Sequence, residues 1–180
     1  SLIRLEYSSE GKFVDEPSIL VQNRDWGKAD YQVSEDRGWL VIKTKMLSLR
    51  YLLGSGPLNG ENLNISWKLD DKIMNWKPGD DDPQNLGGTV AALDGVSRDN
   101  LPPFPPGVLS RSGYFFLDDS PHPLWDVEEE WWKPRPPTSQ QDWHFFCYGH
   151  NYPLALNEYT RLTGRIPMLP RYAFGAWYSR

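Results

Sequence analysis

Cysteine is almost absent from this 180-residue sequence, which contains only Cys147. A single cysteine excludes an internal disulfide bond and a zinc site built on cysteines, and we expect Cys147 to be a small buried residue of a strand. The three histidines lack the i, i+4 spacing of a zinc-binding helix, no serine lies in a Gly-x-Ser-x-Gly turn, and no lysine-containing phosphate loop occurs. The sequence therefore predicts neither a metal nor a cofactor.

Concentrated positive charge and long apolar runs are also lacking. The formal net charge is −5 at pH 7, which argues against nucleic acids and membranes as partners because both require a concentrated positive field. No apolar run approaches the ~18 residues of a membrane span, and the first residues do not have the form of a signal peptide. A signal peptide cleaved before residue 1 would leave no trace, so the compartment stays open, with the cytoplasm slightly favoured.

Tryptophan, proline and glycine are abundant by contrast, with 9, 16 and 15 residues. Many aromatic residues combined with many chain-breaking residues indicate short strands joined by structured loops. Aromatic surfaces of that kind often contact sugars. The length and the 39% content of hydrophobic residues are typical of one folded domain, with or without a short appendage.

Several segments have the periodicity of strands. Residues 63–69 alternate between apolar and polar, which predicts a strand with one buried face. Residues 143–148 are apolar on both faces and predict a strand in the middle of packed layers. The apolar phase slips by one residue near Met46, between residues 40–46 and 47–51, which predicts a bulge or a bend into a second sheet.

A hairpin is predicted where residues 107–109 and 114–117 flank a turn containing Gly113, which supplies a positive φ. Further loops are marked by Asn59-Gly60, Pro78-Gly79 and Gly87-Gly88. Strands of this length between such loops favour a mostly β fold, an antiparallel β-sandwich over residues 1–150.

One helix and one extended connector follow the predicted strands. Asn151 as cap, Pro153 in the first turn and Gly164 as stop predict a single amphipathic helix over residues 151–163. The prolines of residues 166–170 require an extended chain after the helix, because each disfavours the α region at the residue before it. The aromatic residues from position 172 onward then predict the start of a buried strand.

Three acidic groups are candidates for acid–base catalysis or cation binding, namely residues 80–82, 118–119 and 128–130. Residues 80–82 follow Pro78-Gly79 in a turn and lack the alternating pattern of a calcium loop, so a solvated loop is the simpler interpretation. The aspartates at 118 and 119 close a strand, where side chains commonly cap their own backbone. Local chemistry alone thus predicts a non-catalytic β-domain.

The last thirty-odd residues resemble one family. A Gly-His-Asn-Tyr sequence at 149–152, a helix ending in Leu-Thr-Gly at 162–164, a proline-rich connector and an aromatic segment from residue 172 resemble the junction in glycoside hydrolase family 31, the α-glucosidase and α-xylosidase group. In that family, the junction leads from an N-terminal β-sandwich into a (β/α)8 barrel. Further matches lie upstream, at residues 3–8 with 23–24, 85–89 with 93–95, and 107–111 with 116–120.

This resemblance implies a domain organisation. Residues 1–150 would form the N-terminal β-sandwich, of the galactose mutarotase-like supersandwich type, and residues 151–171 the helix and connector. Residues 172–180 would begin a catalytic (β/α)8 barrel that is truncated at its first strand. The catalytic carboxylates of the family lie on later barrel strands, in a Trp-x-Asp-Met-Asn type of motif that does not occur here. No catalytic residue is therefore expected in this stretch, which alone should be inactive.

The resemblance also implies substrate-binding residues. Trp177 and then Tyr178 are candidates for the wall of the sugar pocket, because the end of the first barrel strand borders that pocket. An aromatic residue at this place is at least as often a filler of the barrel interior. Asp94, which lies in a loop of the sandwich, is a candidate for substrate contact, although a role in its turn is the commoner alternative.

Three functions stay open from the sequence. The first is the non-catalytic N-terminal domain of a retaining α-glycosidase that hydrolyses terminal α-linked glucose or xylose, supporting the barrel and contributing a loop to the substrate site. Its partner would be an oligosaccharide or glycoside, and its exposed terminal strand would pack on its own domain or self-associate. The second is a free-standing carbohydrate-binding β-sandwich, and the third is a structural interaction domain.

Overall fold

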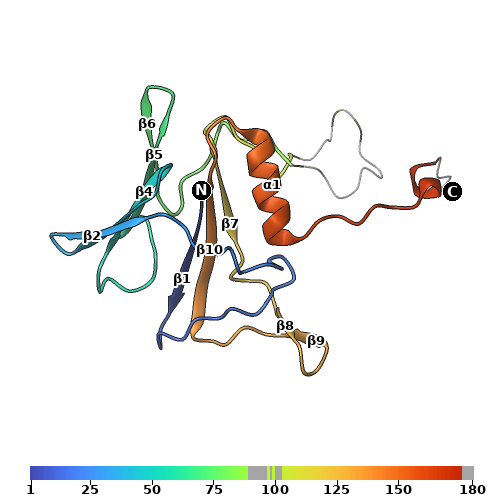
Figure 1. Cartoon of the computed structure of the whole chain (residues 1–180), viewed down its shortest axis with the longest axis horizontal. Helices are drawn as coiled ribbons and strands as arrows, with labels where there is room; N and C mark the ends of the chain where they lie inside the picture. The colour runs from blue at the N-terminus through green and yellow to red at the C-terminus, as the bar shows by residue number, and fades with distance from the viewer. Residues whose placement is uncertain (89–96, 98, 100–102, 176–180) are drawn as a thin grey trace.

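The computed structural model describes residues 1–88, 97, 99 and 103–175, and over these residues the chain is mostly β, with antiparallel sheets and one α-helix. This confirms the predicted β class. A three-stranded sheet lies between a five-stranded sheet and helix α1 (Tyr152–Thr163) (Figure 1). A separate hairpin is formed by β8 (Leu124–Asp126) and β9 (Trp131–Lys133). Within the described ranges, no helix is long and apolar enough to cross a membrane.

The five-stranded sheet is an antiparallel meander, in which strands adjacent in sequence are adjacent in space. Its strands are β2 (Gln32–Asp36), β3 (Trp39–Lys43), β4 (Leu47–Leu52), β5 (Leu63–Leu69) and β6 (Lys72–Trp76). The strand predicted at residues 63–69 is β5, and its alternating burial confirms the period of two.

The change of apolar phase near Met46 is a turn, which corrects the predicted bulge or bend into a second sheet. β3 and β4 pair with each other in the same sheet, and the chain reverses between them. Thr44 N donates to Leu47 O at 2.9 Å, and Thr44 Oγ1 accepts from the backbone N of Met46 at 3.2 Å and of Leu47 at 3.1 Å. Because this threonine closes the turn with its own side chain, two strands replace the single bent strand.

The three-stranded sheet is antiparallel, with β10 in the middle. Its strands are β1 (Leu2–Ser8), β10 (Ser139–Cys147) and β7 (Tyr114–Asp118), in the order β1-β10-β7. The strand predicted to be apolar on both faces is part of β10, whose two faces pack into two different clusters. Cys147 is 1% exposed, which confirms the predicted small buried residue of a strand, and this burial raises the pKa of its thiol to about 11.

Both sheets contribute side chains to one apolar core. Trp67 and Trp76 of the five-stranded sheet pack on Phe145 of β10, with ring centroids 5.7 and 5.0 Å away. Tyr114 of β7 stacks on the same ring at 5.3 Å, with an interplanar angle of 9°. Phe145 is fully buried and therefore forms the centre of the contact between the two sheets.

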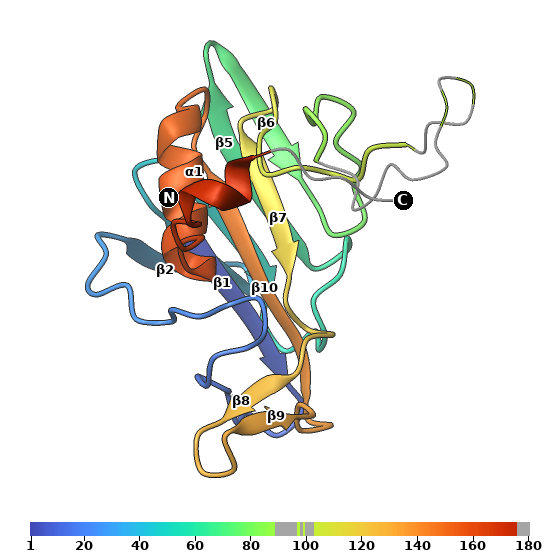
Figure 2. The same cartoon turned by 90° about the vertical axis from the view of Figure 1, so that its right-hand side faces the viewer.

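Helix α1 covers the other face of the three-stranded sheet (Figure 2). The predicted caps are confirmed, since Asn151 Oδ1 accepts from Leu154 N at 3.1 Å and the helix ends at Gly164 with a φ of +88°. The buried cluster beneath the helix consists of Val21, Phe146, Tyr148, Ala155 and Leu162. This cluster occupies only part of the face, and the rest of the face is polar.

The predicted turn at Gly113 exists, but the strand predicted before it does not pair with β7. Gly113 has a φ of +76°, as expected, and its N donates to Ser110 O at 3.2 Å. Residues 107–109 pair instead with an earlier loop, through a bond of 2.9 Å from Leu86 N to Leu109 O. The Tyr148 hydroxyl accepts from Ser110 N at 2.7 Å, which directs this segment away from β7.

The connector after α1 has no regular structure over residues 164–170, in agreement with the predicted extended chain. Ile166 and Met168 are 88% and 93% exposed. The buried strand predicted from Tyr172 is wrong where it is described, because Arg171–Phe174 is a 3-10 helix. Its backbone bonds run from Ala173 N to Pro170 O and from Gly175 N to Tyr172 O, and Tyr172 is 77% exposed. The rest of that predicted strand lies outside the described residues.

We expect Phe145→Ala to lower the free energy of unfolding by about 3–5 kcal/mol, because it leaves a cavity between two tryptophans and a tyrosine. Urea denaturation followed by tryptophan fluorescence measures the change. Phe13→Ala is the matched control, since Phe13 is 63% exposed and its truncation should change the value by less than about 0.5 kcal/mol. Equal effects of the two substitutions would contradict a core centred on Phe145.

Candidate functional site

A pocket of about 330 Å³ lies where the end of β6 meets the start of β7. We call it the acidic pocket. Its lining combines aromatic rings with polar groups of the following turn and loops: Trp76, Tyr114, Phe115, Phe116, Gly79, Asp80, Asp81, Asp82, Asn85 and Pro106. Trp76 and Tyr114 are buried at 3% and 7% exposure. A largely aromatic wall with a few convergent polar groups is the usual composition of a small-molecule site.

The turn after β6 positions the acidic side of this pocket. Gly79 has a φ of +96°, and Asp80 Oδ2 accepts from Lys77 N at 2.8 Å. Asp80 and Asp81 are exposed, which agrees with the predicted solvated turn. Asp82 differs, because it is half-buried and faces the protein.

In the acidic pocket, the Asp82 carboxylate has unusual hydrogen bonding. Its Oδ1 accepts from Ser112 Oγ at 2.9 Å and from Gln84 N at 3.2 Å. Its Oδ2 is buried and has no hydrogen-bond partner, an arrangement that is costly for a carboxylate oxygen. Burial, together with the nearby carboxylates led by that of Asp82, raises the pKa of the Tyr114 hydroxyl. The tyrosine therefore stays protonated and is able to donate a hydrogen bond.

These groups fit sugar binding better than acid–base catalysis. A sugar ring offers apolar C–H surface to aromatic side chains, while its hydroxyls donate to carboxylates and accept from a tyrosine O–H. The carboxyl groups of residues 80–82 come from one short turn on one side of the pocket, whereas a glycosidase needs two that flank the scissile bond. Over the described residues, no group of three acidic, histidine or cysteine side chains could hold a metal ion.

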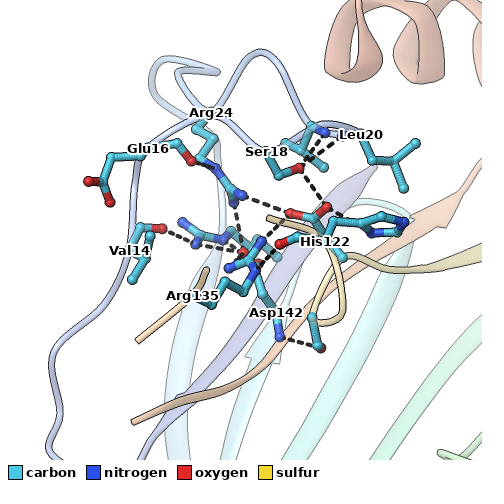
Figure 3. Close-up of polar contacts among 12 residues, drawn as sticks. Val14, Glu16, Ser18, Leu20, Arg24, His122, Arg135 and Asp142 are labelled. Atoms are coloured by element: carbon cyan, nitrogen blue, oxygen red, sulfur yellow. Dashed lines mark hydrogen bonds and ion pairs between the residues drawn. The ribbon is translucent and has the colours of Figure 1, made fainter. Parts of the chain in front are cut away.

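A second polar arrangement is buried on the outer face of the three-stranded sheet. We call it the ionic cluster; it consists of Arg4, Arg24, Arg135, Asp119 and Asp142. Arg24 bridges the two aspartates, with Nη2 at 2.8 Å from Asp119 Oδ2 and Nη1 at 2.9 Å from Asp142 Oδ2. Arg135 bridges the same two oxygens, and both arginines point toward Asp142 in Figure 3. Arg4 Nε completes the cluster at 2.8 Å from Asp142 Oδ1.

The two aspartates of the ionic cluster have different proton affinities. Both are fully buried. Burial raises the pKa of Asp119, and the Ser18 hydroxyl and the two bridging arginines do not fully offset it. Burial also acts to raise the pKa of Asp142, but the hydrogen bond from Arg4 and the charges of Arg24 and Arg4 outweigh it, so that this pKa is lowered.

The ionic cluster is a structural clasp rather than a catalytic centre. Both carboxylates are inaccessible, and their oxygens are occupied by guanidinium groups or by the Ser18 hydroxyl, which donates to Asp119 Oδ1 at 2.6 Å. The cluster holds the long loop between β1 and β2 against the sheet. Arg24 Nε donates to Glu16 O at 2.7 Å, and Ser18 Oγ accepts from Val21 N at 2.7 Å. The loop is therefore fixed by charge and backbone bonds, without strand pairing of its own over most of its length.

The predicted substrate-binding residues Trp177, Tyr178 and Asp94 all lie outside the described residues. Among the acidic groups, residues 128–130 are exposed in the β8–β9 turn, as a solvated loop would be. Asp118 caps its own backbone as predicted, since its Oδ1 accepts from Ser120 N at 2.9 Å.

Asp119 contradicts the same prediction, because its side chain contacts distant arginines instead of its own backbone. Asp119 directly follows β7 and still pairs with β10 through Asp119 N and Asp142 O at 2.9 Å. The alternation of the strand therefore continues to Asp119, whose side chain faces the protein when that of Asp118 faces solvent. Sequence reasoning also missed Asp142 and its arginines. One local signal existed: Asp142 and His144 alternate with Trp143 and Phe145, which indicates a polar stripe on a strand that is otherwise apolar.

Arg24→Met should lower the free energy of unfolding by about 3–5 kcal/mol, because it leaves two buried carboxylates with one bridging partner fewer. Lys12→Met is the control: its partner Glu10 lies at 3.2 Å and Lys12 is 81% exposed, so the loss should stay below about 1 kcal/mol. Urea denaturation at neutral pH measures both. A change below about 1 kcal/mol for Arg24→Met would show that the clasp is not needed.

His144 should make stability depend on pH. Burial lowers the pKa of His144 from 6.5 to about 4, with further lowering by Arg24, Arg4 and Arg135 and opposition from Asp142. The unfolded state therefore binds a proton at His144 near pH 6.5, whereas the native state binds it only near pH 4. Stability is lost as the pH falls through this window, by about 3 kcal/mol in total.

His144→Gln removes this proton uptake, and the decline in unfolding free energy between pH 6.5 and 4 should become shallower than in the unchanged chain. His150→Gln serves as the control, because the His150 side chain is 48% exposed. The measurement is a series of denaturation curves across that window. If His150→Gln flattens the profile as much as His144→Gln, the assignment to His144 fails.

Comparison of the chain with protein-family models finds no match, and comparison with curated proteins finds none either.

Proposed function

We propose that this chain is the N-terminal, non-catalytic part of a retaining α-glycosidase of glycoside hydrolase family 31, acting on terminal α-linked glucose or xylose. Its role would be to support a catalytic (β/α)8 barrel and to contribute a loop to the substrate site. The proposal starts from the sequence resemblance over residues 149–180 and the upstream matches.

The order and exposure of the elements after β10 carry this proposal. The central strand leads directly into the capped helix α1, and the helix leads into the extended connector, in the order that the resemblance implies. In Figure 1 the connector runs away from both sheets. Ile166 and Met168 on it are 88% and 93% exposed, so both apolar side chains are available to pack against another structure. The barrel would supply that structure.

The arrangement of the two sheets supports a β-sandwich of the galactose mutarotase-like type over residues 1–150. The aromatic residues of both sheets meet at Phe145, as in two layers packed face to face. Residues 151–171 would be the helix and connector, and residues 172–180 would begin the barrel.

The chemistry of such an enzyme would require two carboxyl groups about 5 Å apart, one as nucleophile and the other as acid and then base. Asp119 and Asp142 are unsuited to it, because their oxygens are held by arginines and are inaccessible. In this proposal the catalytic pair would lie on later strands of the barrel, as the family resemblance implies. Trp177, Tyr178 and Asp94 remain our proposed substrate contacts from this part of the protein.

A free-standing carbohydrate-binding module is the second candidate. The acidic pocket favours it, because its aromatic and acidic lining belongs entirely to residues 76–116 and needs no barrel for its assembly. The two candidates differ in one respect: a binding module would retain glycosides without hydrolysing them, whatever sequence follows it.

Hydrolysis of 4-nitrophenyl α-glucoside and α-xyloside distinguishes the candidates. We expect no activity in the 180-residue chain and activity in a chain extended by several hundred downstream residues, because the extension supplies the carboxylate pair. The control is the extended chain without residues 1–150, which should lose activity through loss of its support. Activity in the 180-residue chain, or inactivity of a folded extended chain, would overturn the proposal.

A further inference from the structure

A second pocket, of about 310 Å³, lies on the outer face of the three-stranded sheet. It is formed between β1, β10 and the loop at residues 24–27, and we call it the Trp26 pocket. The side chains that matter for its chemistry are Arg4, Arg24, Asp25, Trp26 and His144. None of them lines the acidic pocket, which lies at the meeting of β6 and β7.

His144 contributes a buried polar group without a partner. It lies on β10 opposite Arg4 of β1 and is 2% exposed, and its Nδ1 is buried with no hydrogen-bond partner. Buried polar atoms in folded proteins are nearly always hydrogen-bonded, so such an exception calls for an explanation. His144 also lines the Trp26 pocket, so a ligand there would lie against the imidazole. Because burial keeps the ring neutral near neutral pH, it offers one donor and one acceptor.

Trp26 forms an aromatic wall that is already held in place. The indole Nε1–H donates to Asn23 O at 3.2 Å. The guanidinium of Arg161, from helix α1, lies 4.5 Å from the ring centroid, a cation–π contact that fixes the ring from the helix side. The ring is therefore already oriented in the absence of a ligand. Binding does not have to order it, and this smaller loss of entropy favours affinity.

The two arginines of the Trp26 pocket are already engaged within the protein. Arg4 and Arg24 line it together with Asp25, and both arginines donate to Asp142, at 2.8 and 2.9 Å. Because these guanidinium groups are paired, an anion gains little from displacing their partner, and a neutral ligand is favoured.

We propose that the Trp26 pocket binds one glycosyl unit of a neutral carbohydrate. The apolar side of the sugar ring would lie against Trp26, and its hydroxyls would bond to His144 and Asp25. The volume is near the lower limit for small-molecule sites, which suits one monosaccharide unit. This inference goes beyond the proposed function, because binding here depends on neither the barrel nor the acidic pocket, and it would hold a glycan at a second place on the protein.

Titration of the full 180-residue chain with methyl α-D-glucopyranoside and methyl α-D-xylopyranoside tests this site. Nuclear magnetic resonance follows the indole N–H signals of Trp26 and Trp76, one for each pocket. We expect at least one of the two sugars to shift the Trp26 signal in a saturable way, below about 10 mM. Sodium acetate, as a small anion, should leave that signal in place.

Two substitutions assign the binding to the pocket. His144→Phe keeps the ring and removes both nitrogens, and Trp26→Leu removes the aromatic wall; calorimetry should show at least about tenfold weaker binding in each. Asp82→Asn, in the acidic pocket, is the matched control and should change the affinity less than about twofold. If His144→Phe does not fold, the Trp26→Leu chain decides.

Absence of a saturable shift with either sugar, a shift confined to Trp76, or displacement of the Trp26 signal by acetate would each overturn the proposal. So would unchanged affinity in a folded Trp26→Leu chain. None of these outcomes changes the result expected when the extended chain is tested for hydrolysis. Failure of that hydrolysis test would in turn leave sugar binding at Trp26 measurable in the shorter chain.

Discussion

The structure depends on the neutralisation of two carboxylates that have no access to water. Asp119 and Asp142 can be buried only if guanidinium groups reach them, and these come from three separate segments: Arg4 from β1, Arg24 from the long loop and Arg135 from the segment after β9. Because the three arginines share the same two carboxylates, the cluster ties these three segments to one another. The loop between β1 and β2, which forms little regular structure, acquires a fixed path in this way.

Successive side chains of β10 point to opposite faces of the three-stranded sheet, and the two faces differ in chemical character. Trp143, Phe145 and Cys147 face the core between the sheets, whereas Asp142, His144 and Phe146 face outward. The outward row changes from ionic to apolar along the strand, and His144 stands at the transition. The Trp26 pocket is located at this transition, where neither the helix nor the arginine clasp fills the face completely.

Elements governed by local patterns could be predicted from the sequence. The strand β5, the central strand β10 and the caps of α1 follow from periodicity and from residues a few positions apart. The antiparallel β class follows from their number and spacing. The 3-10 helix at Arg171–Phe174 was missed because its apolar composition resembles that of a strand.

The candidate sites could be predicted only in part, because they are made by contacts between distant residues. Arg24 and Asp119 are 95 positions apart in the sequence, and no local pattern connects them. Asp82 was interpreted as part of a solvated turn, since the sequence does not reveal that Ser112 reaches it from another loop. The predicted pairing of residues 107–109 with β7 is wrong for the same reason, because the distant hydroxyl of Tyr148 binds Ser110 N and redirects the chain there.

The pairing of β1 with β10 has a consequence for the order of folding. Ser1 N donates to Cys147 O across 146 positions, while the five-stranded meander is complete by Trp76. During synthesis, the meander can therefore assemble while β1 still lacks its neighbour. Closure of such a large loop is entropically slow, and β1 must be among the last strands to find its place. Until then the tryptophan face of the meander stays uncovered, and the partly folded chain exposes apolar surface that favours aggregation.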